Sequence, residues 1–259
     1  MGILNMTPDS FSDGGKFNIE DKAFKRISKM TCSGADIIDI GGESTRPGSK
    51  IIQPKIEWKR IEKVVKKFKK KFPKKLLSID TRKSLIMKNA INYKTDIIND
   101  VSCFKFDSNS ITTVRNKNLY KVIHHMQGTP QTMQINPKYD HVLLDIYDFF
   151  ENQINKLKKD KHRDKIILDP GIGFGKNYLQ NIELLNNLSI FHTLNCSIML
   201  GVSRKRFISS ISSENNPKMR LGGTISATLN ALMQGIKIHR VHDVNQVNQA
   251  VKVFEKLNS

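Results

Sequence analysis

Polar side chains that could do chemistry stand at the ends of eight short apolar runs in this chain. They occur at Asn5, Asp80, residues 99–100, His125, Asp169, residues 203–205 and residues 242–243, and the second run leads into the segment GGESTR (41–46). A single Asp after an apolar run is usually a turn former or a helix N-cap. Capping alone does not explain eight polar endings in corresponding positions, so the pattern favours an enzyme.

Three of these endings offer acceptors and three others offer positive charge. Asp80, Asn99 and Asp169 supply two carboxylates and an amide, and such groups need paired donors when they are buried. A flat nitrogen heterocycle with an amidine-like NH/NH2 edge supplies those donors in bidentate geometry. The basic groups suit a phosphate or a carboxylate, and they are Lys205, Arg240 and His242. The residues therefore indicate a nitrogen heterocycle that carries an anionic group.

The apolar runs that position these residues recur on the scale of βα units. They span residues 2–4, 36–40, 76–79, 96–98, 120–123, 165–168, 197–200 and 237–241, with starts about 20 to 45 residues apart. Segments that can be helical follow, for example 20–33, 54–71, 83–93, 140–159 and 220–234. Eight units in 259 residues predict one (β/α)8 TIM barrel domain over residues 1–259, with long loops after the first and second strands over its C-terminal mouth. A doubly wound sheet is the alternative.

Two other patterns have plainer interpretations. The segment GIGFGK (171–176) lacks GxGxxG spacing, and Asn177 stands where a phosphate-binding loop needs Ser or Thr, so we interpret it as a tight strand-to-helix turn. His124 and His125 are adjacent and point to opposite faces of a strand, which forms no paired metal site; His125 is either structural or part of an active-site wall. Glu43 has no nucleophile at a suitable spacing, and we expect it to organise its loop.

The net charge of +19 is a weaker guide to function. The chain has 33 Lys and only 10 Arg, whereas nucleic-acid binders favour Arg. Eleven basic residues fall within residues 55–75, where apolar residues at helical spacing put the lysines on a solvated face. We therefore expect no nucleic-acid partner. No apolar run approaches the ~20 residues of a membrane span, so no membrane partner is expected either. Three separated cysteines and no visible signal peptide predict a cytoplasmic protein.

Eight motifs occur in an order that matches one family. They are NMTPDSFSDGG (5–15), DIGGESTRPG (39–48), SIDT (78–81), INDV (98–101), HMQGTP (125–130), DPGIGFGK (169–176), GVSRK (201–205) and RVHDV (240–244). With these motifs the chain resembles the dihydropteroate synthases over essentially its whole length.

The resemblance implies a (β/α)8 enzyme of folate biosynthesis, a transferase of an alkyl group other than methyl. Such an enzyme condenses 6-hydroxymethyl-7,8-dihydropterin pyrophosphate with p-aminobenzoate to give 7,8-dihydropteroate and pyrophosphate, and Mg2+ is its cofactor. Sulfonamides compete for the p-aminobenzoate site. The family also implies a homodimer through helices near the C-terminus, for which residues 220–234 and 244–257 are the candidates. We expect an SN1-like displacement, because pyrophosphate is a good leaving group and its departure leaves a cation delocalised into the dihydropterin. The arylamine nucleophile is neutral at pH 7 and needs no strong base.

The resemblance also assigns roles residue by residue. The pterin site comprises Asp80, Asn99, Asp169, Lys205 and Arg240. The pyrophosphate site comprises Asn5, Arg240 and His242, with Asn5 also reaching the Mg2+. The p-aminobenzoate site is bordered by Thr45, Arg46, Pro47, Phe174 and Ser203. The catalytic residues are Asp13, Lys205, Arg240 and His242, with Asp13 on the first long loop; Lys176 is a weaker candidate.

Two alternatives remain at this point. A pterin-binding methyltransferase acting on methyltetrahydrofolate shares the barrel and the Asp/Asn/Asp set by resemblance, although residues 45–48, 203–205 and 240–242 argue against it. A basic RNA- or membrane-surface protein is the alternative from a different class, and it depends on the lysine-rich segment 55–75.

Overall fold

The computed structural model describes residues 1–7, 19–44 and 48–259. These residues form one sheet of eight parallel strands in sequence order. The strands are β1 (Gly2–Asn5), β2 (Ile37–Gly41), β3 (Leu76–Asp80), β4 (Ile97–Asp100), β5 (Tyr120–His124), β6 (Ile166–Asp169), β7 (Ser197–Leu200) and β8 (Ile238–His239). A parallel bridge between Gly2 and Val241 joins the last strand to the first, so the sheet closes into a barrel.

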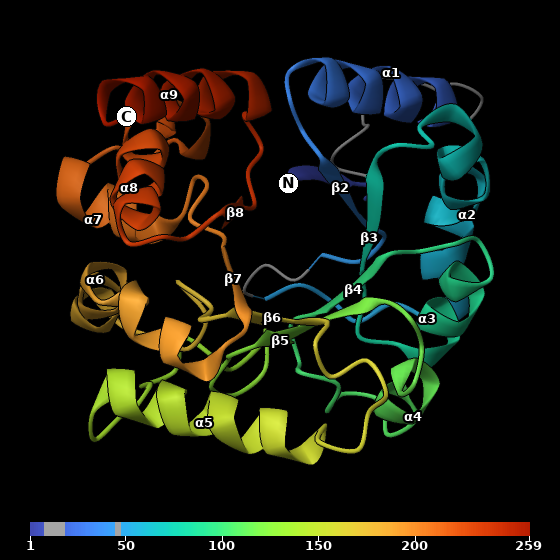
Figure 1. Ribbon diagram of the computed structural model, residues 1–259, viewed down its shortest axis with the longest axis horizontal. Helices are drawn as coiled ribbons and strands as arrows, with labels where there is room; N and C mark the ends of the chain where they lie inside the picture. Colours follow the sequence, from blue (N-terminus) through green and yellow to red (C-terminus); the bar gives the residue numbers. More distant parts are fainter. Residues whose placement is uncertain (8–18, 45–47) are drawn as a thin grey trace.

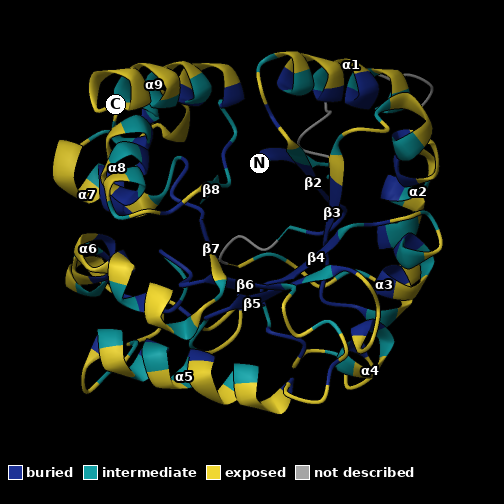
Figure 2. Ribbon diagram, in the orientation of Figure 1, coloured by how far each residue is buried: buried dark blue, intermediate teal, exposed yellow. Residues whose placement is uncertain are grey.

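Helices surround this barrel in the order of the chain (Figure 1). They are α1 (Ile19–Cys32), α2 (Pro54–Lys71), α3 (Ser84–Ile91), α4 (Ser110–Val114), α5 (Val142–Lys156), α6 (Tyr178–Asn186), α7 (Arg206–Ser212), α8 (Leu221–Met233) and α9 (Val244–Leu257), with short 3-10 helices η3 (Leu188–Leu194) and η4 (Pro217–Met219). Figure 2 shows buried residues on the strands and exposed residues on the outer faces of the helices. The (β/α)8 TIM barrel predicted from the sequence is confirmed, and the doubly wound sheet is excluded.

Helix α2 shows how the sequence forms the outer layer. Pro54 occupies the first turn, where its missing N–H is not needed. Ile61, Val65 and Phe68 recur at helical spacing and are fully buried against the barrel. The lysines take the outer face, as predicted, and several are paired there: Lys66 with Glu62 at 2.5 Å, Lys67 with Glu20 at 2.6 Å and Lys69 with Asp96 at 2.5 Å. None of the described helices is both long enough and apolar enough to cross a bilayer.

The barrel interior has an apolar floor and a polar mouth, because side chains two residues apart on a strand share one face. The floor is an apolar cluster of Ile97, Val122, Ile167 and Met199. Two residues further along their strands come Asn99, His124 and Asp169, all of them buried. Since parallel strands in a barrel end at the same rim, these polar groups meet at the C-terminal mouth.

The predicted strands agree closely with the observed ones. Several strands extend one residue beyond the apolar run, because the polar residue that ends it still pairs with the neighbouring strand, as Asp80 does with Asn99. The last strand is shorter than predicted. Only Ile238–His239 pair with β7, while Val241 makes the bridge to Gly2.

The turn after β6 requires glycine at position 171. Gly171 has a φ of +66°, and an added Cβ would lie 1.9 Å from the carbonyl oxygen of His125. We predict that Gly171→Ala lowers the free energy of unfolding by about 3 kcal/mol, combining left-handed strain with overpacking. Urea denaturation measures the loss. Gly48→Ala is the control, since Gly48 also has a positive φ, +76°, but nothing within 4 Å. Equal losses in both variants would contradict the proposed clash.

Candidate active site

The mouth of the barrel is organised around the carboxylate of Asp39, which lies within β2 and is buried. Its Oδ1 accepts a hydrogen bond from Ser78 Oγ at 2.6 Å. Its Oδ2 accepts from Arg240 Nε at 2.7 Å and from Asn99 Nδ2 at 3.3 Å. Three strands and the residue that follows β8 thus meet at one carboxylate. A buried carboxylate with these donors is fully compensated.

Arg240 bridges two carboxylates. While its Nε binds Asp39, its Nη2 donates to Asp80 Oδ2 at 2.7 Å. Burial alone would lower the pKa of Arg240, but Asp39 and Asp80 more than offset it and raise this pKa above its ordinary value. Burial raises the pKa of Asp80 above its ordinary value, against the opposing effect of Arg240. The guanidinium is therefore a fixed positive charge that both carboxylates hold in place.

Asn99 leaves one acceptor unused at the centre of this cluster. Its Nδ2 donates to Asp39, but within the described part of the chain its buried Oδ1 has no hydrogen-bond partner. A buried polar atom without a partner is costly unless a ligand satisfies it. Asn99 Oδ1 therefore marks where a ligand N–H would bind, next to Asp80 on the neighbouring strand.

Asp169 and Lys205 form the opposite side of the mouth. Asp169 Oδ1 accepts from Gly171 N at 2.8 Å, which fixes the glycine-rich turn. Lys205 Nζ donates to the carbonyl of Ile172 in that turn and lies 4.7 Å from the ring centroid of Phe174. Burial lowers the pKa of Lys205 to about 8, with Asp169 opposing this shift and Arg240 adding to it. Lys205 is thus a cation at pH 7 whose charge is lost just above neutrality.

His242 and Ser203 form a separate pair at this rim. The His242 backbone N–H donates to Ser203 Oγ at 3.2 Å, and the ring Nδ1 lies 3.0 Å from the same oxygen. Burial, followed by the nearby Arg204 and Arg240, lowers the pKa of His242 to about 3. His242 is therefore neutral at pH 7, which corrects the positive charge expected from its residue type. It can still donate a hydrogen bond to an anion from its ring.

A cavity of about 1480 Å³ opens beside this cluster. Its wall includes residues to which the sequence assigned a binding or catalytic site: Asn5, Phe174, Ser203, Lys205 and His242, with the weaker candidate Lys176. Further basic residues line it, namely Arg26, Arg204, Arg206, Lys218 and Arg220, and no Asp or Glu is among its described lining residues. Low-dielectric walls that carry positive charges attract anionic ligands. Among residues 1–7, 19–44 and 48–259 no group of three His, Cys, Asp or Glu side chains could hold a metal ion.

The two histidines that end β5 have different environments. His124 faces the mouth, with its ring edge-on to Phe174 at 4.6 Å and its Nδ1 3.1 Å from the carbonyl oxygen of Val101. His125 points away and contacts Lys176 Nζ at 2.9 Å through its Nδ1. Burial lowers both imidazole pKa values, that of His124 to about 4, and also lowers the pKa of Lys176. His125 is therefore structural, and Lys176 holds the turn through the carbonyls of Gly171 and Phe174.

The structure brings most of the predicted site residues together. Through hydrogen bonds, shared strand ends or the common cavity it unites Asn5, Asp80, Asn99, Asp169, Phe174, Ser203, Lys205, Arg240 and His242. Four predicted residues lie outside the described part of the chain: Asp13, Thr45, Arg46 and Pro47.

Sequence reasoning assigned no role to Asp39 or Ser78, and it considered His124 only to exclude a paired metal site. Asp39 and Ser78 precede the strand ends, so a search for polar residues at those ends passes over them. The alternation of side chains along a strand could have identified Ser78, because it lies two residues before Asp80 and therefore shares the interior face of β3.

Comparisons with known proteins identify the family of the chain. Residues 1–242 match a family described as "Pterin binding enzyme". The dihydropteroate synthase of Escherichia coli K12 is 39% identical over 256 residues, which cover 98% of this chain and 90% of the relative. The chain therefore belongs to the pterin-binding enzymes, in the dihydropteroate synthase family. The predicted family, enzyme class and activity are thereby confirmed in preference to both alternatives.

Solved structures of this family have the same fold. A Yersinia pestis dihydropteroate synthase in a sulfonamide drug complex matches with a TM-score of 0.91 and 37% identity, covering 100% of this chain and 93% of that one. A Xanthomonas albilineans dihydropteroate synthase with 4-aminobenzoic acid matches with a TM-score of 0.93 and 32% identity, covering 100% and 92%. Both matches cover the full length of this chain.

The charge of Lys205 provides a direct test of the site's electrostatics. Since Asp169 raises the pKa of Lys205, we predict that Asp169→Asn moves this pKa below 8. The rate of modification of Lys205 by an amine-specific reagent, followed across pH by mass spectrometry, reports the pKa. Asp243→Asn is the control, because Asp243 pairs with Arg204 instead. The same pKa in wild type and Asp169→Asn would contradict this account.

Proposed function

We propose that the mouth of this barrel binds 6-hydroxymethyl-7,8-dihydropterin pyrophosphate and p-aminobenzoate and joins them to form 7,8-dihydropteroate. The observation that carries this proposal is the acceptor set of Asp80, Asp169 and Asn99, whose Oδ1 has no hydrogen-bond partner among the described residues, together with the Lys205 cation on the same side as Asp169. A pterin presents N–H and NH2 donors along one edge and a carbonyl oxygen nearby, which complements that arrangement.

The pterin lies between the Asp39–Asp80–Arg240 cluster and the side of the mouth formed by Asp169 and Lys205. Asp80, Asn99 and Asp169 accept from its N–H groups, and Lys205 donates to its oxygen. Arg240 is pinned by Asp39 and Asp80, so its guanidinium plane is available as a surface on which the pterin ring stacks. The pre-set charges need little reorganisation when the substrate arrives.

The pyrophosphate occupies the adjoining rim. Arg240 supplies a permanent positive charge, neutral His242 supplies a ring N–H, and Asn5 lines the same cavity. Mg2+ keeps several waters and takes few protein ligands when phosphate oxygens are present, so one amide oxygen from Asn5 fits it without a carboxylate cage. When bound, Mg2+ would neutralise charge on the leaving pyrophosphate.

The p-aminobenzoate site adjoins the pterin through Phe174 and Ser203, which line the cavity. The Phe174 ring, held between Lys205 and His124, gives the arylamine an apolar face. Thr45, Arg46 and Pro47 complete this site by resemblance. The sulfonamide complex of the Yersinia pestis relative supports competition of sulfonamides for the same position.

The chemistry follows from these positions as an SN1-like displacement. The C–O bond to pyrophosphate breaks first, the leaving group takes the electron pair, and the exocyclic methylene becomes a cation delocalised into the dihydropterin. The neutral arylamine nitrogen then attacks the methylene and releases a proton. Asp13 stabilises the cation electrostatically in this proposal. No described side chain needs to act as a strong base, because positioning and charge stabilisation supply most of the acceleration.

We also propose that the chain acts as a homodimer in the cytoplasm. Helices α8 and α9 pack together near the C-terminus (Figure 1), and exposed apolar side chains lie on or beside them, namely Met219, Met233, Val253 and Leu257. Apolar groups gathered in this way favour a self-complementary contact.

Mixing the purified protein with Mg2+, dihydropterin pyrophosphate and p-aminobenzoate tests the function. We predict formation of dihydropteroate, detected by chromatography, and its loss with EDTA. Asp169→Ala should abolish binding of a pterin ligand in calorimetry. The variant should still fold, with a free energy of unfolding lowered by about 1–3 kcal/mol, because the Gly171 N–H loses its acceptor. Absence of product from folded wild type would refute the function, and retained pterin affinity in Asp169→Ala would refute that residue's role.

The dimer proposal predicts a mass twice the 29.6 kDa of the chain in light scattering. Val253→Glu should shift the protein toward the monomer, because it buries a charge at the α9 contact. Ile135→Glu places the same charge on another exposed apolar residue and should leave the mass unchanged. A monomeric wild type at micromolar concentration would refute the dimer.

A further inference from the structure

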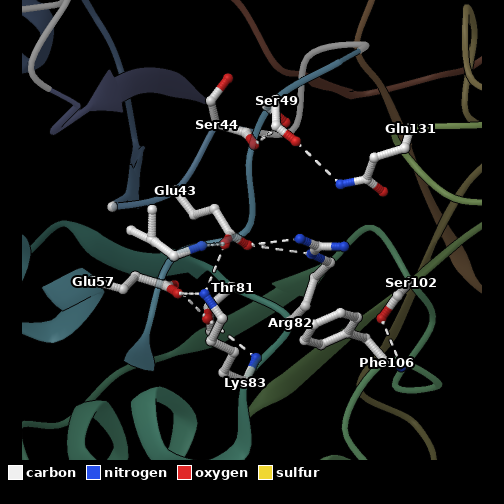
Figure 3. Close-up of polar contacts among 12 residues, drawn as sticks. Glu43, Ser44, Ser49, Glu57, Thr81, Arg82, Lys83, Ser102, Phe106 and Gln131 are labelled. Carbon is white, nitrogen blue, oxygen red and sulfur yellow. Dashed lines mark hydrogen bonds and ion pairs between the residues drawn. The ribbon is translucent and has the colours of Figure 1, made fainter. Parts of the chain in front are cut away.

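Four charged side chains form a buried network beside the mouth but outside the pterin cluster. Figure 3 shows Glu43, which follows β2, facing Arg82 and Lys83, which follow β3, and Glu57 on α2. Glu43 Oε2 accepts from Arg82 Nη2 at 2.8 Å and Glu43 Oε1 from Lys83 Nζ at 2.7 Å. Lys83 Nζ also donates to Glu57 Oε2 at 2.6 Å. Two carboxylates thus balance two cations, and all four residues are buried.

Glu43 also fixes the segment that follows it. Its Oε1 accepts from the backbone N–H of Ile52 at 3.0 Å, nine residues later. Within segment 43–52, Ser49 Oγ donates to the carbonyl of Ser44 at 2.6 Å. From outside the segment, Gln131 Nε2 donates to the carbonyl of Ser49 at 3.1 Å (Figure 3). Both ends of segment 43–52 are therefore tied at one carboxylate. The segment encloses residues 45–47, which the proposed function assigns to p-aminobenzoate.

The network attaches this segment to the strand that carries Asp80. Thr81, Arg82 and Lys83 follow Asp80 directly, and Thr81 Oγ1 donates to Glu57 Oε1 at 2.6 Å. The Arg82 guanidinium also stacks on Phe106 at 4.3 Å. Burying four charges adds little net stability, because desolvation offsets most of the attraction. What the network supplies is a defined position, relative to Asp80, for Glu43 and Ile52, the described residues at the two ends of segment 43–52.

We propose that Glu43 is a positioning residue for the arylamine substrate, holding segment 43–52 in register with the pterin-binding end of β3. This inference rests on the proposed function. Glu43 touches neither reacting group and acts through the segment. Its loss should weaken capture of p-aminobenzoate and leave pterin binding, which depends on the Asp39 cluster, unaffected.

The matched variants are Glu43→Gln and Glu57→Gln. Each removes one negative charge from the same buried network. Glu43→Gln keeps the shape of the side chain but turns an NH2 donor toward the donors of Arg82, Lys83 or Ile52. Glu57 accepts from Thr81 and Lys83 and, among the described residues, makes no carboxylate bond to segment 43–52. Only Glu43→Gln therefore releases the segment.

We expect Glu43→Gln to raise KM for p-aminobenzoate at least about tenfold, the order of loss that misplaced binding groups cause. KM for the pterin substrate should stay within about twofold, and Glu57→Gln should leave both constants within about twofold while losing similar stability in urea. An unchanged KM for p-aminobenzoate in Glu43→Gln, or an equal rise in Glu57→Gln, would overturn the proposal.

Two further measurements keep the test decisive. If Glu43→Gln does not fold, Glu43→Gln combined with Arg82→Met removes one charge of each sign and leaves the Lys83–Glu57 pair; the same rise in KM is expected. If the wild type makes no dihydropteroate, the proposed function fails, and hydrogen exchange then tests the positioning separately. Faster exchange of the Ile52 amide in Glu43→Gln than in Glu57→Gln supports it, and equal rates overturn it.

Discussion

The contact on which the rest of this structure depends is the clamp of Arg240 between Asp39 and Asp80. It joins the residue that follows the last strand to the second and third strands, across the point where the barrel closes. Backbone pairing there is sparse, because β8 contributes only Ile238–His239 and a bridge from Val241 to Gly2. The Arg240 guanidinium therefore has two functions. It holds the closing strands together at the rim, and it supplies the positive charge that contacts the substrate.

This arrangement determines which groups remain free for a ligand. Asp39 is satisfied by Ser78, Asn99 and Arg240, so it orients its neighbours and has little capacity left. Asn99 must turn its NH2 toward Asp39, which leaves its oxygen without a donor among the described residues. Asp80 gives one oxygen to Arg240. The pterin edge is thus recognised by acceptor oxygens that are not fully used by hydrogen bonds within the protein, such as Asn99 Oδ1.

Much of this could be predicted from sequence, for identifiable physical reasons. Short apolar runs and their polar endings located all eight strands and most of the rim residues, because burial and strand ends leave local signals. Charge states were not predictable. The pKa of His242 is lowered chiefly by burial, which residue type does not reveal. The pKa of Lys205 is lowered by burial and further by Arg240, a neighbour 35 residues away along the chain. Short helices such as Ser110–Val114 leave little periodic signal.

The two buried charge clusters meet at β3 and the three residues that follow it, and this explains how one barrel can present two substrates to each other. Ser78 and Asp80 point inward to the Asp39 cluster, whereas Thr81 and Lys83 bond outward to Glu57 and Glu43. Lys83 comes only three positions after Asp80, a span that peptide geometry limits to about 10 Å. The pterin acceptors and the anchor of segment 43–52 are thus mounted on one short, rigid piece of chain. Reacting atoms must meet within about 3–3.5 Å, and a shared strand provides that precision better than two independent loops would.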